Sequence, residues 1–94
     1  MRLSTLAAMA LEARRERKAA DTRRRRIDEL ESRIAEREQA IKDLEATMSA
    51  QGFYDNHEKA KPVLDRHQAL MWEVGDLIGQ WEALQEHAQE PQGS

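Results

Sequence analysis

The sequence predicts an all-α protein: an antiparallel two-helix coiled-coil hairpin with a basic N-terminal helical extension. Two apolar stripes lead to this prediction, one in residues 27–48 and one in residues 63–88. Their three- and four-residue spacings place the apolar side chains on one face of an α-helix. Composition is the third observation, because 35% charged and 4% aromatic residues suit long helices rather than a thick globular core.

Charge divides the chain into a basic extension, residues 1–26, and an acidic remainder. The extension holds nine basic and three acidic side chains, a net charge of +6. Residues 27–94 hold six basic and fifteen acidic side chains, a net charge of −9. Such an asymmetry concerns partners and assembly rather than fold.

The extension is compatible with one long helix from about residue 5 to residue 49, since neither Pro nor Gly precedes Gly52. Ser4 or Thr5 is the candidate N-cap. The apolar stripe is weak before Ile27, so we expect the extension to be helical only marginally, or only when docked.

Residues 27–49 form the first helix of the predicted hairpin. Its stripe is narrow and needs a partner helix. Arg37 interrupts the stripe at a d position. It either sets the register through Glu73 or Glu38, or extends its guanidinium past the edge of the stripe into water, and we favour the second. The apolar positions are Ile27, Leu30, Ile34, Ile41, Leu44 and Met48.

Residues 50–62 form the predicted tip of the hairpin. Gly52 is a candidate for the left-handed position that ends a helix. Asp55 and Glu58 have the spacing of a capping box, so a new helical turn is expected to begin at Asn56.

Residues 63–89 form the second predicted helix, with residues 91–94 as a frayed tail. Pro62 implies that the turn before it is either separate or joined to the helix through a kink. Pairing outward from the tip leaves residues 1–22 projecting beyond the second helix. The expected layers are Met48 with Val63, Leu44 with His67, Ile41 with Leu70, Arg37 with Val74, Ile34 with Leu77, Leu30 with Trp81, and Ile27 with Leu84.

Several segments together carry a family resemblance over about residues 14–88. They are the basic lead-in, Ile27-Asp28-Glu29-Leu30-Glu31, Phe53-Tyr54, Glu58-Lys59-Ala60 and Trp81-Glu82-Ala83-Leu84. The chain resembles the C-terminal coiled-coil domain of ABC-F ATPases, the Uup-like group. In that family the domain is an antiparallel hairpin appended to twin ATPase cassettes and linked to nucleic-acid binding, and the parent proteins act on ribosomes. Departures from the family pattern are Arg37, Pro62, Gly75 and Gly79.

The residues themselves do not predict an enzyme. No nucleophile–base pair, metal cluster, cofactor motif or Gly-Lys-Ser/Thr phosphate loop can be assembled. The ATPase cassettes expected as partners would belong to a parent chain. There is no cysteine, which suits the cytoplasm, and no apolar run of membrane-spanning length, so no membrane partner is expected.

The candidate nucleic-acid-binding residues are basic side chains of the extension together with the tip residue Tyr54. Closely spaced cations can neutralise phosphates, whereas a solvated helix face balanced by nearby acids is the simpler alternative. Consecutive arginines point all around a helix, so we expect no single stripe and no base specificity. DNA and RNA, including ribosomal RNA, both remain open as ligands. The basic candidates are Arg14, Arg15, Arg17, Lys18, Arg23, Arg24, Arg25 and Arg26.

An outer surface of the second helix suggests a different function, protein interaction or dimerisation. An exposed Trp beside two glycines predicts a shallow notch. We expect either residues 3–13 or a second copy of the chain to dock there. The surface consists of Met71, Trp72, Gly75, Ile78 and Gly79.

Overall fold

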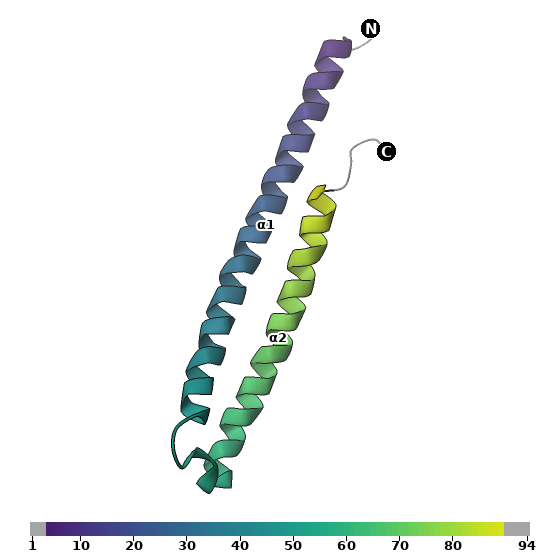
Figure 1. Ribbon diagram of the computed structural model, residues 1–94. Coiled ribbons are helices and arrows are strands. Elements are labelled where there is room, and N and C mark those ends of the chain that lie inside the picture. Colours follow the sequence, from purple (N-terminus) through teal and green to yellow (C-terminus); the bar gives the residue numbers. More distant parts are fainter. Residues whose placement is uncertain (1–3, 90–94) are drawn as a thin grey trace.

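The protein is a rod of two antiparallel helices, which confirms the predicted fold class (Figure 1). The structure, a computed structural model, describes residues 4–89. Helix α1 spans Thr5–Met48, the 3-10 turn η1 spans Phe53–Asp55, and helix α2 spans His57–Gln89. The molecule measures 80 × 21 × 17 Å. The predicted frayed tail, residues 91–94, lies outside the described residues, as do residues 1–3.

Helix α1 is one unbroken helix of 44 residues. Ser4 begins it, because its side-chain oxygen accepts a hydrogen bond from the Ala7 N–H at 3.1 Å and so satisfies one of the free donors of the first turn. No Pro or Gly interrupts the helix before Met48. The described part of the extension is helical throughout, since Ala and Arg favour a helix, and its marginal stability stays a prediction.

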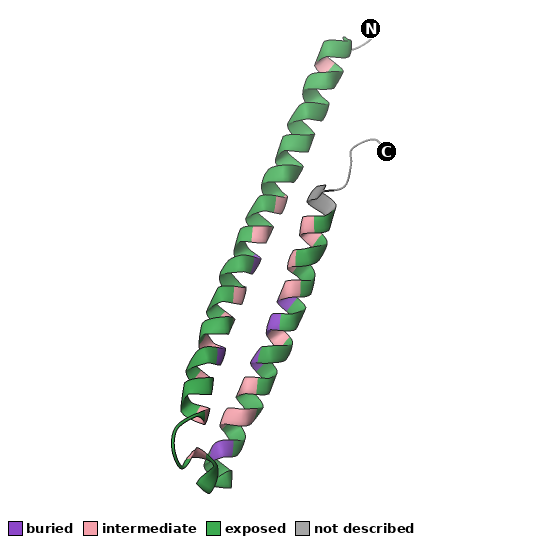
Figure 2. Cartoon of the chain, in the orientation of Figure 1, coloured by how far each residue is buried: buried purple, intermediate pink, exposed green. Residues whose placement is uncertain are grey.

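The core is a thin layer of apolar side chains between the two helices. Figure 2 shows the buried positions facing the opposite helix along both α1 and α2. Leu70 is the most enclosed, at 1% exposure. Such a core has no third layer, so its stability depends on a few residues. The buried residues are Leu30, Ile41, Ala60, Leu70, Val74 and Leu77.

The helices pair in the predicted register. Cross-helix polar contacts fix this register, because each joins residues within one position of the expected layers. They also tie the edges of the apolar seam together at three heights along the rod. The contacts are Arg37 Nε to Glu73 Oε1 at 2.8 Å, His67 Nε2 to Glu45 Oε2 at 3.2 Å, and Trp81 Nε1 to Glu31 Oε2 at 3.0 Å.

The tip differs from the expectation at the end of α1. The helix stops at Met48, and Ser49 is its C-cap, with right-handed backbone angles. Gly52 does adopt the left-handed conformation, with φ of 83°, but three residues later, where it leads into η1. A side chain would be strained at this φ, so Gly52 reverses the chain rather than capping α1.

Helix α2 begins at His57 rather than at Val63. Asn56, not Asp55, caps it, because the Asn56 side-chain oxygen accepts a hydrogen bond from the Lys59 N–H at 3.2 Å. Pro62 lies inside the helix as its sixth residue and deprives only the Glu58 carbonyl of a donor. Ala60 is 2% exposed, and its packing against the hairpin holds this first turn in helical form.

The register leaves the N-terminal part of α1 without a neighbouring helix. Gln89, where α2 ends, stands opposite residue 22, and Figure 1 shows α1 continuing alone past this point. The lone segment of α1 measures about 25 Å at 1.5 Å per residue. We refer to residues 5–26 of α1 as the arm.

Candidate functional site

The predicted basic residues all lie on the arm. Seven of the eight are exposed, and Arg23 is half-buried. Within residues 4–89, the only one of them in an ion pair is Arg15, whose Nη1 lies 3.5 Å from Glu12 Oε1. Most basic side chains of the arm are therefore not neutralised by an ion pair with a nearby acid.

Because the arm is a regular helix, its cations are sorted by direction. Arg14, Lys18 and Arg25 point within about 40° of one another, on the side away from α2, at 100° per residue. We call these three the basic ridge. Arg15 and Arg26 flank the ridge on one side, and Arg17 and Arg24 flank it on the other. As expected, the four consecutive arginines point in different directions around the helix, so the ridge and its flanks form a broad cationic face rather than one narrow stripe.

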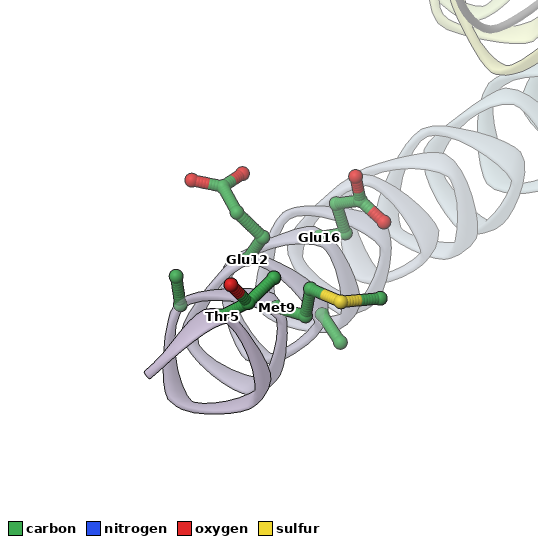
Figure 3. Close-up of a pocket in the computed structure, with 6 residues that line it drawn as sticks. Thr5, Met9, Glu12 and Glu16 are labelled. Atoms are coloured by element: carbon green, nitrogen blue, oxygen red, sulfur yellow. The ribbon is translucent and has the colours of Figure 1, made fainter. Parts of the chain in front are cut away.

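The opposite side of the arm has a different character. A shallow depression there is lined by Thr5, Met9, Glu12 and Glu16, with two alanines (Figure 3). Met9 is 61% exposed. Its carboxylates and uncovered apolar side chain disfavour phosphate, so the ridge side is the one that suits an anionic ligand.

At the other end of the rod, η1 carries the two tip aromatics. Phe53 and Tyr54 form an edge-to-face pair with ring centroids 4.8 Å apart and an interplanar angle of 89°. Phe53 is half-buried, whereas Tyr54 is 63% exposed. Tyr54 is thus the ring that a ligand can reach.

Arg37 forms the shortest of the three polar contacts between the helices, at 2.8 Å. Its Nε donates a hydrogen bond to Glu73, which is one of the two predicted partners. Its Nη1 lies 3.2 Å from Glu36, and not beside Glu38, the other predicted partner. This hydrogen bond raises the pKa of Arg37 above its ordinary value, and the charge of Glu73 adds to the effect. The side chain is 30% exposed, so it lies at the edge of the seam and is paired there rather than only hydrated.

The residues of the proposed interaction surface differ in how exposed they are. Trp72 and Met71 are 73% and 52% exposed, and apart from the local helix backbone and the adjacent residues no atom lies within 4 Å of a Cβ built on Gly75 or Gly79. Ile78, however, packs against the core.

Docking of the N-terminal segment on this surface within one chain is wrong for residues 4–13. They continue α1 at the far end of the rod, because no breaker allows the chain to fold back. Residue 3 lies outside the described residues.

Sequence reasoning missed a row of carboxylates, Glu31, Glu38 and Glu45, along the hairpin. They border two depressions whose apolar walls come from both helices. Their seven-residue spacing was the available signal, since such spacing keeps side chains on one side of a coiled-coil helix.

Comparison with known proteins bears on the hairpin and the end of the arm. A family model described as the ABC transporter C-terminal domain matches residues 18–86. No curated protein and no solved structure matches the chain. Among the described residues, no helix is long and apolar enough to cross a membrane, and no group of three or more potential ligands could hold a metal ion. Because the family model covers most of the chain, the protein belongs to the ABC transporter C-terminal domain family, as its resemblance to the ABC-F coiled-coil domain predicts.

Proposed function

We propose that this domain binds nucleic acid through its arm, as a non-catalytic C-terminal part of an ABC-F-type ATPase. The cassettes of the parent chain would hydrolyse ATP, and the hairpin would hold the arm away from them. DNA and ribosomal RNA are the candidate ligands, and a ribosomal ligand would be met in the cytoplasm. The observation that carries the proposal is the basic face of the arm, which is exposed, has almost no ion pairs and has no neighbouring helix before residue 22.

The chemistry of the face favours phosphate over bases. Arg and Lys side chains that approach phosphates release condensed counterions, which makes binding strong at low salt and weak at high salt. The arm presents no Asn or Gln that would pair with adenine edges and no aromatic side chain that would stack on bases, and its arginines are spread too widely around the helix to line up along base edges. The proposed binding is therefore electrostatic and without sequence specificity.

Tyr54 offers a second, separate contact by stacking on an exposed base. It lies at the opposite end of a rod 80 Å long from the arm. A duplex of about 10 base pairs extends only about 34 Å and cannot reach both. A short duplex offers Tyr54 no unpaired base and therefore tests the arm alone, and longer single strands test whether Tyr54 adds affinity.

The test is fluorescence anisotropy with labelled short duplex DNA, single-stranded DNA and structured RNA at several salt concentrations. The variant replaces the basic ridge: Arg14→Glu, Lys18→Glu and Arg25→Glu. Removing three phosphate contacts should reduce the salt slope on duplex DNA by roughly 3 and weaken binding at least about 100-fold at low salt.

A matched control separates the arm from net charge. Lys42→Glu, Lys59→Glu and Arg66→Glu change the total charge equally, and all three residues are exposed on the hairpin. The control should bind much better than the ridge variant. Equal losses in the two variants, or no binding by the unaltered chain at low salt, would contradict the proposal.

A further inference from the structure

A shallow groove runs along one face of the hairpin, at the line where the two helices meet. Two adjoining depressions of about 310 and 300 Å³ form it, and Glu38 borders both. Ile34, Ile78 and Trp81 line the first, whereas Ile41, Met71 and Val74 line the second. The groove is therefore mostly apolar inside and is bordered by carboxylates of α1.

One edge of this groove is acidic, and the same stripe of α1 becomes basic in the arm. Glu31, Glu38 and Glu45 form the edge at seven-residue intervals. Continuing the interval toward the N-terminus gives Arg24 and then Arg17. All five side chains are exposed, and within residues 4–89 neither arginine forms an ion pair. The stripe thus carries opposite charges at its two ends.

We propose that the arm of a second copy of the chain occupies this groove, in an antiparallel dimer with two-fold symmetry. When two α1 helices lie antiparallel, Arg17 faces the partner's Glu38 and Arg24 faces the partner's Glu31. The two-fold axis repeats both pairs, because a symmetric interface uses the same patch on each copy. In this one alignment, both arginines of each copy therefore face a glutamate of the other copy.

The dimensions of the two elements agree. The lone part of the arm is about 25 Å long, and the groove edge from Glu31 to Glu45 covers about 21 Å of helix. Ala13 and Ala20 lie beside the two arginines on the arm, and their small side chains allow close approach to the larger groove residues. Within the described part of the single chain, nothing fills the groove and no helix covers the lone part of the arm. In the dimer, the arm of each copy fills the groove of the other.

The same alignment fixes the shape of the dimer. Its axis passes beside Ile27 and Asp28, close to the middle of α1, so the two rods overlap along almost their whole length. The dimer should then be thicker than one chain but not longer than about 80 Å. Two arms about 25 Å long and roughly 10 Å across bury on the order of 1,000 Å², which suits micromolar association.

The experiment is a charge exchange followed by sedimentation equilibrium at about 100 µM chain and low salt. One variant carries Arg17→Glu and Arg24→Glu, and the other carries Glu31→Arg and Glu38→Arg. Each alone places like charges across the interface and should remain near 10.9 kDa. Their equimolar mixture restores opposite charges at all four contacts and should reach twice that mass, as should the unaltered chain.

Control measurements keep the result interpretable. Arg15→Glu with Arg26→Glu makes the same charge change on another side of the arm and should still dimerise. Circular dichroism checks that each variant is helical, and X-ray scattering should give the dimer a longest dimension near that of one chain. A monomeric unaltered chain, or helical variants whose mixture stays monomeric, would overturn the proposal. Sedimentation is carried out without nucleic acid, so this outcome is independent of nucleic-acid binding.

Discussion

At the scale of single residues, the most informative position is Leu70. It is 1% exposed and belongs to the small cluster formed with Ile41 and Val74. In a two-layer rod no other element can close over a cavity at this height. The free energy of unfolding of a single domain is small. The packing around Leu70 therefore accounts for a large share of it.

Leu70→Ala should lower the free energy of unfolding by about 2–5 kcal/mol, since it removes buried methyl groups and leaves a cavity. Urea denaturation followed by circular dichroism measures this change. Trp72→Ala is the matched control, because Trp72 is two residues away and 73% exposed. The control should change stability by less than about 0.5 kcal/mol. Equal effects at the two positions would mean that α2 is rotated relative to this structure.

Arg37 shows how a charge is accommodated in an apolar seam. Its bond to Glu73 raises its pKa, so the guanidinium is protonated in both the folded and the unfolded chain at every pH near neutrality. A group with a raised folded-state pKa loses its contribution only as the pH rises through that pKa. Titration of Arg37 therefore gives no pH dependence of stability between mildly acidic and mildly basic conditions.

At the scale of elements, the two glycines of α2 weaken a helix that packing otherwise holds. Apart from the local helix backbone and the adjacent residues, no atom lies within 4 Å of a Cβ built on Gly75 or Gly79, and both residues are exposed. Glycine in a helix interior costs about 1 kcal/mol relative to alanine, because it loses more conformational freedom on folding. Nothing within the single chain offsets that cost.

Gly75→Ala with Gly79→Ala should therefore raise the free energy of unfolding by about 2 kcal/mol in total, measured by thermal melting. Gly52→Ala is the contrasting change. Its φ of 83° strains any side chain, and the new Cβ would lie 3.2 Å from Asp55 Oδ2, so the melting temperature should fall. A fall for the α2 pair would show that the glycine surface is covered in solution.

At the scale of the whole molecule, the buried core lies in the hairpin and most of the basic charge lies in the arm. Every buried residue of the described chain lies between Leu30 and Leu77. The arm contributes length and charge, and its exposed Leu6 and Met9 contact no second helix. The rod thus combines a folded body with a helix that is free to bind something else.

A chain that begins at residue 23 should keep the fold of the hairpin. Its melting temperature at low concentration should stay within a few degrees of the full chain, because none of the core is removed. Its affinity for short duplex DNA should fall at least about 10-fold, as part of the basic face is lost. Thermal melting and anisotropy measure the two properties. A large loss of stability would show that the arm packs on the body of its own chain.

The hairpin and its register could be predicted from the sequence because both follow from local spacing. Heptad positions such as Ile41 and Leu70 must be buried together, and only one antiparallel alignment does this along the whole seam. The family resemblance rests on the same residues. The basic character of the arm is likewise a property of composition, so Arg14 and Arg25 could be identified without coordinates.

Only the tertiary structure decided the start of α2 and the presence of the groove. Pro62 opposes a helix locally, but burial of Ala60 against the hairpin outweighs one lost hydrogen bond. The groove needs side chains from both helices at one height, as with Ile34 and Trp81, which lie far apart in the sequence. The sequence by itself thus determined what each helix must bury, whereas the paired helices determined which surfaces remained uncovered, because exposure depends on neighbours distant along the chain.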